Sequence, residues 1–377
     1  MLASVASTID QFNMPNISLL QELGYEVEVA CNFVHGSNCS DERIAQLKEN
    51  LSEQNVRFHH IDFTRQVFNL KQEYIAYRQL KKLVGETSYD FIHCHTPIGG
   101  VIGRLVGHKH GVKVIYTAHG FHFYTGAPLL NWLLFYPIEK WLARYTDVLI
   151  TINEEDYARA KSKFRAKSLK YIRGVGVDTS VFNPAAIDAA GKKQQLGIPE
   201  AAHVLLSVGE LNNNKNHAVV MKALKEINNP DYHYVICGKG AKKEELGNLA
   251  EELGIADQVH LLGFRTDVAE LYAMSDVFLF PSRREGLSVA LMEAIASGVP
   301  AVVSNIRGNK DLVADGENGY LVAVDDVQGY AQKIRELIEN PQKAKEMSEK
   351  GRARIKQFDI VPVTAEMKKI YQGMVTR

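Results

Sequence analysis

The chain has 377 residues, more than one ordinary hydrophobic core accommodates, so two α/β domains are expected. Its 44 basic residues balance 44 acidic ones, which excludes a global electrostatic attraction to nucleic acid. Four cysteines without a Cys-x-x-Cys pair argue against a disulfide framework and favour a reducing cytosol.

The N-terminal half alternates short β-rich runs with helical patterns. A first strand ends near residues 5–6, and helices are expected at 41–55 and 66–84. Further strands are expected at 26–31, 91–95, 112–117 and 148–152. This alternation predicts a doubly wound parallel sheet.

A second series of the same kind follows the glycine-bearing stretch 174–178. Buried strands are expected at 204–208, 232–237, 259–262, 277–280 and 301–303, again with helices between them. The fold class is therefore α/β, with two Rossmann-like doubly wound domains facing each other across a cleft. A last helix is expected at about 363–372, and the pattern alone does not assign it to a domain.

The stretch 283–300 combines an anion site with two carboxylates. It follows the strand at 277–280, and a helix is expected from 289 to 297, with Ser288 as its N-cap and Gly298 after its end. The free N–H groups near Gly286, Leu287 and Ser288 suit an anion. Glu285 and Glu293 cannot hold phosphate, so we expect them to hold hydroxyl groups of the same ligand, which indicates a nucleotide sugar.

The loop 208–217 is a second candidate for binding phosphate. It follows a buried strand, Lys215 can place a charge on a diphosphate, and Gly209 allows close approach. A solvated, Asn-rich turn is the alternative for this loop taken alone. The spacing of Gly238 and Gly240 completes no dinucleotide or P-loop motif. Arg265, after the strand at 259–262, either edges a base pocket or lies in a plain turn.

Four histidines cluster in the first half, at positions 93, 95, 119 and 122. His93 and His95 share one face of a strand, but no nearby Cys, Asp or Glu completes a metal site, so hydrogen-bonding roles are favoured and no metal is expected. His119 lies at the carboxyl end of a strand, where active-site groups belong in this architecture. It is a catalytic candidate, with a structural role as the alternative.

Two segments carry apolar or basic side chains. Residues 129–142 are apolar on nearly all sides but are interrupted by Asn131, Pro137 and Glu139, so they are not expected to span a bilayer. Lys71, Arg78 and Lys82 share one helical face. Core packing of the first and solvation of the second are favoured, and contact with an anionic membrane is the alternative. With no signal peptide in view, we expect a cytoplasmic protein, peripheral on the inner face of the cell membrane under that alternative.

These motifs resemble those of a known family. Glu285 and Glu293, separated by seven residues and followed by Ser-Gly-Val-Pro300, resemble the E-x7-E motif of the family-four retaining glycosyltransferases of GT-B fold. The similarity continues through 316–322 and backward through 262–265 to Gly209 and Lys215. Residues 10–13 and 116–124 resemble the bacterial capsule and exopolysaccharide branch. The resemblance covers nearly the whole chain, and its motif in the second domain is specific.

The resemblance implies roles for individual residues. Glu285 would hold donor-sugar hydroxyls, Glu293 the ribose, and the amides near Leu287 and Ser288 the distal phosphate. Lys215 would neutralise the departing diphosphate, Arg265 would lie near the base, and His119 would face the reacting sugar. Gly209 and Gly286 belong to the donor side, and the acceptor-side candidates are Gln11, Phe12, His95 and His122. No metal or cofactor is expected, because the lysine and the helix N-terminus take the place of a divalent cation.

The implied domains are an acceptor domain over 1–178, a donor domain over 179–355 and a C-terminal helix over 356–377 that packs back on the first domain. The implied reaction moves a sugar from a nucleoside-diphosphate sugar, expected to be a UDP-sugar, to a hydroxyl of a lipid-linked saccharide. One departure matters: Glu210 stands where the family usually has an arginine after the glycine of the lysine loop. The rival interpretations are a nucleotide-sugar epimerase of the same fold and a catalytically silent nucleotide-binding partner of a glycosyltransferase pair.

Overall fold

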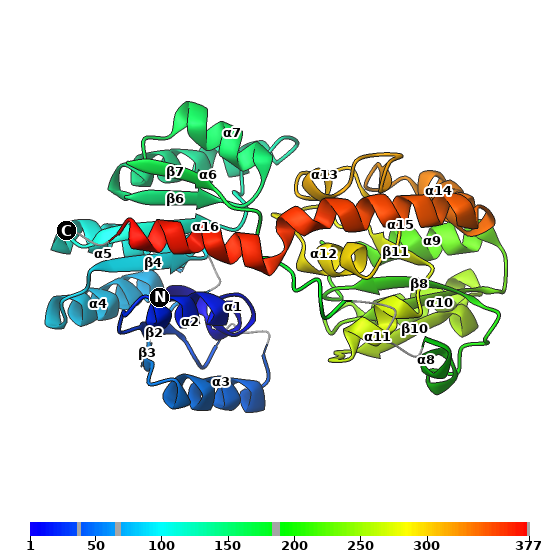
Figure 1. The fold of residues 1–377 in the computed structure, drawn as a ribbon, viewed down its shortest axis with the longest axis horizontal. Helices are drawn as coiled ribbons and strands as arrows, with labels where there is room; N and C mark the ends of the chain where they lie inside the picture. The colour runs from blue at the N-terminus through cyan, green and yellow to red at the C-terminus, as the bar shows by residue number, and fades with distance from the viewer. Residues whose placement is uncertain (36–38, 65–68, 183–188, 375–377) are drawn as a thin grey trace. The chain divides into compact units, whose positions relative to one another are not determined.

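The structure, a computed structural model, describes residues 1–35, 39–64, 69–182 and 189–374. The chain divides into two compact units, Met1–Val175 with Pro362–Arg377, and Gly176–Val361. The sheet of each unit is built from parallel pairs, with helices on both of its faces (Figure 1). No helix in the described part of the chain is long and apolar enough to cross a membrane.

The first unit contains a seven-stranded sheet in the order β3-β2-β1-β4-β5-β6-β7. Its strands are β1 (Leu2–Val5), β2 (Glu28–Asn32), β3 (Arg57–His60), β4 (Phe91–His95), β5 (Lys113–Ala118), β6 (Val148–Thr151) and β7 (Ser168–Tyr171). Its helices are α1 (Ala6–Phe12), α2 (Met14–Glu22), α3 (Asp41–Glu53), α4 (Leu70–Glu86), α5 (Pro97–His110), α6 (Leu129–Leu142), α7 (Glu154–Lys163) and, from Pro362 onward, α16 (Ile360–Gln372).

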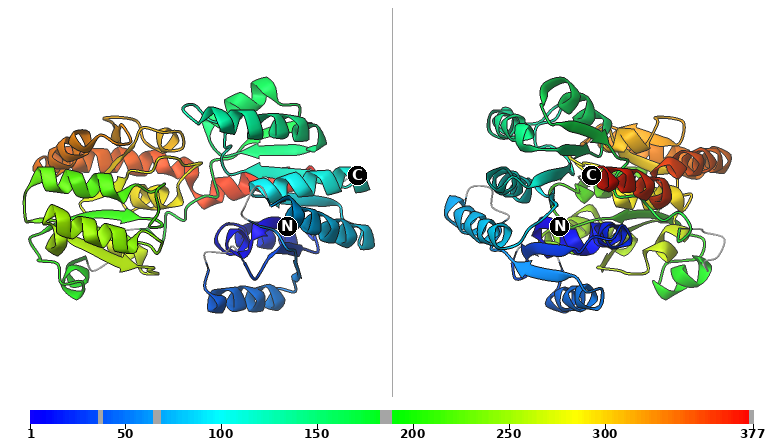
Figure 2. Two further views of the ribbon diagram at one scale, coloured as in Figure 1. Left: turned by 180° about the vertical axis from the view of Figure 1, so that it is seen from behind. Right: turned by 60° about the vertical axis from the view of Figure 1, so that its left-hand side comes forward.

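Successive residues of each strand point to opposite faces of the sheet and contribute to two separate cores in this unit. Ile115 of β5 packs with α1, α2, α3 and α16, whereas Val114 and Tyr116 pack with α4, α5 and α7 on the other face. The C-terminal helix α16 thus covers the same face of the sheet as α1 and α2 (Figure 2). It contributes Val363, Met367, Ile370 and Tyr371 to that core.

The second unit contains a six-stranded sheet in the order β10-β9-β8-β11-β12-β13. Its strands are β8 (His203–Val208), β9 (Tyr232–Cys237), β10 (Val259–Gly263), β11 (Val277–Phe280), β12 (Ala301–Ser304) and β13 (Gly319–Val322). Its helices are α8 (Ala189–Gln195), α9 (His217–Ile227), α10 (Lys243–Leu253), α11 (Val268–Ala273), α12 (Val289–Ala296), α13 (Asn309–Leu312), α14 (Val327–Glu339) and α15 (Pro341–Ile355). The expected α/β class with two Rossmann-like units is confirmed.

The differences from the expected elements have physical reasons. Strands β3, β7 and β13 were not expected, and all three lie at sheet edges, where one side lacks a neighbouring strand. The first strand ends at Val5, and Ala6 already belongs to α1. The expected helix 66–84 begins at Leu70, with residues 66–68 lying outside the described part.

The expected core packing of residues 129–142 is wrong for half of the helix that they form. Leu129, Leu130 and Leu133 of α6 are 74%, 62% and 64% exposed. The inward side of α6 packs Trp132, Phe135 and Tyr136 against the core. It also carries Glu139, whose Oε2 lies 2.8 Å from Nη1 of the buried Arg104 on α5. Only one stripe of a helix can face the core. Because Glu139 occupies part of that stripe in α6, some of its apolar side chains lie on the exposed side.

Candidate functional site

The site in the second unit lies on two loops at the carboxyl ends of neighbouring strands. Strands β8 and β11 are adjacent although β9 and β10 intervene in the sequence, so the chain reverses its direction of winding between them. Ligands of open α/β sheets bind at such a switch point. The two loops are joined by hydrogen bonds, from Arg283 N to Asn214 O (2.8 Å) and from Asn214 Nδ2 to Arg284 O (3.0 Å).

Lys215 and Glu285 form an ion pair where these loops meet. Lys215 Nζ lies 2.7 Å from Glu285 Oε1, and the two side chains are only 19% and 15% exposed. The ammonium group also lies 4.4 Å from the centroid of the Phe280 ring. A Cβ on Gly209 would come within 3.0 Å of the Lys215 side chain, so glycine at 209 leaves room for that side chain. The structure therefore brings Gly209, Lys215 and Glu285 together.

The helix that follows Glu285 begins as its sequence predicts. Ser288 caps α12 by accepting a hydrogen bond from Leu291 N at 3.3 Å, and the helix ends one residue earlier than expected, at Ala296. Gly286 and Leu287 immediately precede this cap. The positive end of the helix dipole and its unpaired N–H groups thus lie next to the Lys215–Glu285 pair in sequence.

Glu293 lies inside α12 and is largely withdrawn from solvent. The Tyr272 hydroxyl is 3.0 Å from both Glu293 Oε2 and the Ala290 carbonyl oxygen. Burial raises the pKa of Glu293 to about 7, and the hydrogen bond from Tyr272 opposes this shift only in part. This carboxyl group can therefore change its charge near neutral pH, and Tyr272 is a partner that the sequence pattern did not reveal.

Gly238 and Gly240, which complete no known phosphate-binding motif, follow β9 and pack against the lysine loop. A Cβ on Gly238 would lie 1.8 Å from Gly209 O, and one on Gly240 would lie 2.3 Å from Leu211 O. Their role is close packing of this loop against the lysine loop rather than a motif of its own. Glu210 is exposed, and Asn212 Oδ1 accepts a hydrogen bond from Lys215 N at 3.0 Å. Asn212 thus shapes the loop.

Arg265 lies at the end of β10, two strands away from β8. Its Nε donates to Asp267 Oδ1 at 2.7 Å, and a second bond joins Nη2 to Oδ2. This contact lowers the pKa of Asp267, to which Lys192 also binds. The structure does not bring Arg265 to the Lys215–Glu285 pair, and a role near the base stays a prediction.

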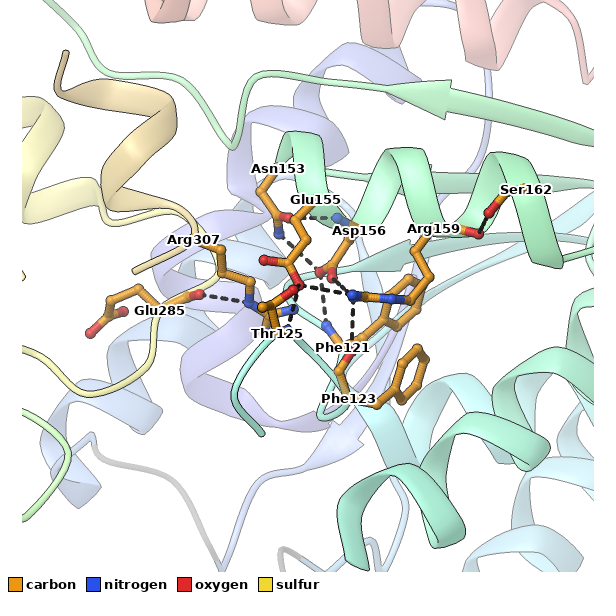
Figure 3. Close-up of polar contacts among 10 residues, drawn as sticks. All are labelled: Phe121, Phe123, Thr125, Asn153, Glu155, Asp156, Arg159, Ser162, Glu285 and Arg307. Atoms are coloured by element: carbon orange, nitrogen blue, oxygen red, sulfur yellow. Dashed lines mark hydrogen bonds and ion pairs between the residues drawn. The ribbon is translucent and has the colours of Figure 1, made fainter. Parts of the chain in front are cut away.

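Arg307 is a site residue that the sequence pattern did not reveal. It follows β12, is only 7% exposed, and donates from Nε to the Glu285 carbonyl oxygen at 3.2 Å (Figure 3). The adjacent Gly308 packs so closely that a Cβ there would lie 2.4 Å from Gly286 O. The available signal was a charged residue before a glycine, three positions after the end of a buried strand.

In the first unit, His95 and His119 lie at the ends of neighbouring strands. His95 Nδ1 is 3.0 Å from His119 Nε2, and both side chains line one pocket. Phe12 lines the same pocket, with its ring centroid 6.5 Å from that of His119. Burial lowers the pKa of His119 to about 4 and that of His95 well below its usual value, so both are neutral at pH 7.

The other acceptor-side candidates do not line this pocket. Gln11 is exposed, and the His122 ring packs 4.7 Å from that of Phe135. Among the described residues, no group of three or more His, Cys, Asp or Glu side chains could hold a metal ion. The structure therefore joins Phe12, His95 and His119, and leaves Gln11 and His122 apart from them.

The loop that carries His119 is anchored by the start of α7 (Figure 3). Asp156 Oδ2 accepts from Phe121 N at 2.9 Å, and Glu155 Oε1 accepts from Thr125 N at 2.7 Å. Arg159 Nη1 donates to the Phe123 carbonyl oxygen at 3.1 Å. Glu155 and Asp156 lie in the first turn of α7, where acidic side chains favour the helix dipole, and they also hold this loop.

Comparison with known proteins gives the family. Residues 188–354 match the family described as glycosyl transferases group 1, and residues 3–153 match glycosyl transferase 4-like. The chain is 38% identical to the glycosyltransferase EpsD of Bacillus subtilis over 378 residues, covering 98% of this chain and 95% of the relative. It is 31% identical to UDP-Gal:alpha-D-GlcNAc-diphosphoundecaprenol alpha-1,3-galactosyltransferase of Escherichia coli, covering 78% of each chain.

Solved structures agree on the fold. The structure of Anabaena Alr3699/HepE in complex with UDP-glucose matches with a TM-score of 0.79 at 21% identity, covering 99% of this chain and 100% of that one. WaaG, a glycosyltransferase involved in lipopolysaccharide biosynthesis, matches with a TM-score of 0.74 at 17% identity, covering 99% and 98%. The resemblance drawn from Glu285, Glu293 and Lys215 is thus confirmed: the chain is a glycosyltransferase of family four with the GT-B fold.

Proposed function

We propose that this glycosyltransferase moves a sugar from a UDP-sugar to a hydroxyl group of a lipid-linked saccharide during exopolysaccharide assembly, with retention at the anomeric carbon. The observation that supports the proposed UDP-sugar donor is the Lys215–Glu285 pair, which precedes the N-terminus of α12. The acceptor half is supported by the relative from Escherichia coli, whose name gives a diphosphoundecaprenol-linked acceptor. Anabaena Alr3699/HepE, which shares the fold, was crystallised in complex with UDP-glucose.

The chemistry follows from the charge on the leaving group. As the bond between the anomeric carbon and the diphosphate oxygen breaks, the diphosphate gains negative charge. The acceptor oxygen forms the new bond to the anomeric carbon, and its proton passes to the departing diphosphate oxygen. Lys215 and the amides at Gly286, Leu287 and Ser288 stabilise that charge, so no divalent cation is required. Glu285 exchanges Lys215 for the sugar hydroxyls when the donor binds, because its carboxylate cannot face phosphate. Glu293 holds the ribose.

A donor screen tests this function. The purified protein is incubated with UDP-, GDP- and ADP-sugars and with a membrane lipid extract, and nucleotide release and lipid-linked product are both measured, with and without EDTA. Transfer from a UDP-sugar that survives EDTA, with the α configuration of the donor kept in the product, supports the proposal. Isomerised sugar without acceptor supports an epimerase. UDP binding with neither hydrolysis nor transfer supports a silent partner subunit.

We propose further that the first unit contacts an anionic membrane to reach the lipid-linked acceptor. Helices α4, α5 and α6 lie against one face of its sheet. Helix α4 exposes Lys71, Arg78 and Lys82 together with Leu70 and Tyr74. The exposed side of α6 is formed by Leu129, Leu130, Leu133, Ile138, Lys140 and Trp141. Basic and large apolar side chains on one layer suit the headgroup region of a bilayer.

Flotation with phosphatidylglycerol-containing vesicles tests this contact. Replacing Lys71, Arg78 and Lys82 by Glu should abolish flotation at low salt, and replacing Leu130 and Leu133 by Asn should weaken it without changing the charge. The matched control replaces the exposed Lys345, Lys350 and Lys356 of the second unit by Glu, and its flotation should resemble that of the wild type. Equal losses in both charge variants would show a nonspecific response to net charge and contradict the proposed surface.

A further inference from the structure

Two neighbouring strands and the C-terminal helix bring a chain of polar side chains together beneath the pocket of the first unit. Tyr371 Oη lies 2.9 Å from His93 Nδ1, and His93 Nε2 lies 2.8 Å from Thr117 Oγ1. The ring of His95 packs on that of His93, with centroids 4.2 Å apart, and His95 Nδ1 contacts His119 Nε2. His93 is therefore held at both nitrogens, and it supports the ring of His95.

The second nitrogen of His95 is sealed within the protein. His95 is 2% exposed, and its Nε2 has no hydrogen-bond partner among the described residues and no contact with solvent. A neutral imidazole carries one N–H group and one lone pair. If His119 donated to His95, the sealed Nε2 would have to carry a hydrogen with no acceptor, an arrangement that folded proteins rarely tolerate. If His95 donates, the sealed nitrogen holds only a lone pair.

We propose that His95 is a positioning residue that donates from Nδ1 to His119 Nε2 and thereby fixes His119 as the tautomer with its hydrogen on Nδ1. In that tautomer the nitrogen of His119 that is not bound to His95 is a hydrogen-bond donor. It suits a sugar hydroxyl or a developing negative charge better than a basic nitrogen would. This inference rests on the proposed function for its consequence in catalysis, while the tautomer itself is a property of the free protein.

The tautomer can be measured without any turnover. In protein labelled with 15N-histidine, long-range 1H–15N correlation spectra distinguish a protonated from an unprotonated ring nitrogen, and the His119 signals are identified by their loss in His119→Gln. We expect His119 with Nδ1 protonated and Nε2 unprotonated at pH 7. The reverse pattern, or rapid averaging between the two forms, overturns the proposal.

Variants at His95 connect this tautomer to turnover. His95→Asn keeps an amide N–H near the position of Nδ1, whereas His95→Leu fills the space without a donor. We expect kcat of His95→Leu to fall by roughly tenfold or more, as the loss of a single oriented hydrogen bond implies, with UDP affinity unchanged. His95→Asn should recover most of kcat. His110→Asn, an exposed histidine at the end of α5, is the matched control and should behave as wild type.

The outcomes separate this inference from the proposed function. A wild-type protein that transfers sugar while His95→Leu keeps full kcat, or while His95→Asn is as slow as His95→Leu, contradicts the positioning role. A wild-type protein that transfers sugar from no donor contradicts the proposed function, and the NMR experiment then still decides the tautomer. Thermal unfolding of each variant shows whether the variant is folded, which distinguishes a lower kcat caused at the site from one caused by unfolding.

Discussion

At the scale of single residues, the charge of Lys215 has one partner in the free protein and another in the proposed reaction. In the free protein its charge is neutralised by Glu285 at 2.7 Å, and it is held above the Phe280 ring. In the proposed reaction the same charge meets the diphosphate. The ion pair keeps the ammonium group partly buried without leaving an isolated charge, which would be costly. The pair is therefore a resting arrangement that the donor exchanges for its own contacts.

Replacing Lys215 by Ala should lower kcat about a hundred- to a thousandfold, because one preorganised donor to developing charge is removed. The affinity for UDP should fall much less than kcat, and steady-state kinetics with the donor found in the screen measures both. Lys225→Ala is the control, since Lys225 is an exposed lysine on α9. An unchanged kcat in Lys215→Ala would remove the lysine from the mechanism.

Glu293 predicts a dependence of stability on pH. Its pKa in the folded protein is about 7 against 4.5 for the unfolded reference, so the folded state holds this proton more tightly. The stability contributed by protonated Glu293 is complete below pH 4.5 and is lost as the pH rises through 7. Glu293→Gln, which is always neutral, should therefore raise Tm relative to wild type at pH 8.

The same substitution should have a smaller effect on Tm at pH 5, where wild-type Glu293 is mostly protonated, and it should weaken UDP binding at both pH values. Differential scanning calorimetry at pH 5 and pH 8 measures the first effect, and titration calorimetry measures the second. A Tm that falls at pH 8 would show that the ionised carboxylate stabilises the free protein. The expected result, a higher Tm at pH 8 together with weaker UDP binding, is a common trade-off when a buried charge at a functional site is removed.

At the scale of elements, the α12 loop depends on close packing between two backbone segments. Gly308 has a φ of 77°, and a Cβ there would lie 2.4 Å from Gly286 O. Gly308→Ala should therefore push the loop before α12 out of place and cost about 1–3 kcal/mol of stability. We expect a lower Tm and at least tenfold weaker UDP binding, since the amides near Ser288 would move.

Gly247→Ala is the matched control for that prediction. Gly247 lies inside α10, and a Cβ there meets no atom within 4 Å. Alanine at this position should leave UDP binding unchanged and raise stability by about 0.5–1 kcal/mol, because it restricts the unfolded chain and favours the helix. Similar losses of UDP binding in both variants would show that the effect at Gly308 is not local.

The elements also show what the sequence could and could not predict. Strand β11 is buried on both faces, and its continuous apolar run indicated its bounds correctly. The bounds of the buried strand β9 were also correct, although His233 interrupts its apolar residues. The edge strand β3, with partly exposed residues throughout, carried no such run. The approach of Lys215 to Glu285 follows from a topological rule, because both loops leave the same end of adjacent strands.

Other contacts follow no such rule. Tyr371 meets His93 across 278 positions of sequence, and that contact depends on where the last helix docks. Arg307 reaches Glu285 O through the course of a short irregular loop. The resemblance in the second unit identified Glu293, but nothing in its spacing pointed to Tyr272 as its partner. Local periodicity carries information on burial, whereas the partners of polar side chains are set by tertiary packing.

At the scale of the whole molecule, the chain begins and ends in the same unit. Residues Pro362–Arg377 belong to the unit that starts at Met1, although residues 176–361 form the other unit between them. The returning segment places Val363, Met367, Ile370, Tyr371 and Met374 in a core shared with α1 and α2. The core of the first unit is therefore completed by residues that follow the second unit in the sequence.

Deleting residues 362–377 should unfold the first unit and spare the second. Fully burying one such apolar side chain is worth about 1.5–3 kcal/mol, so losing five of them removes an amount comparable to the 5–15 kcal/mol that stabilises a typical domain. Calorimetry should show the loss of one thermal transition, and UDP should still raise the temperature of the transition that remains, because the Lys215 and Glu285 loops lie in the second unit. A control that lacks only 375–377 keeps all five side chains and should unfold as the full-length chain does. If the larger deletion also behaved as the full-length chain does, the returning helix would be dispensable for the first unit, and the contact between Tyr371 and His93 would have no part in holding its core.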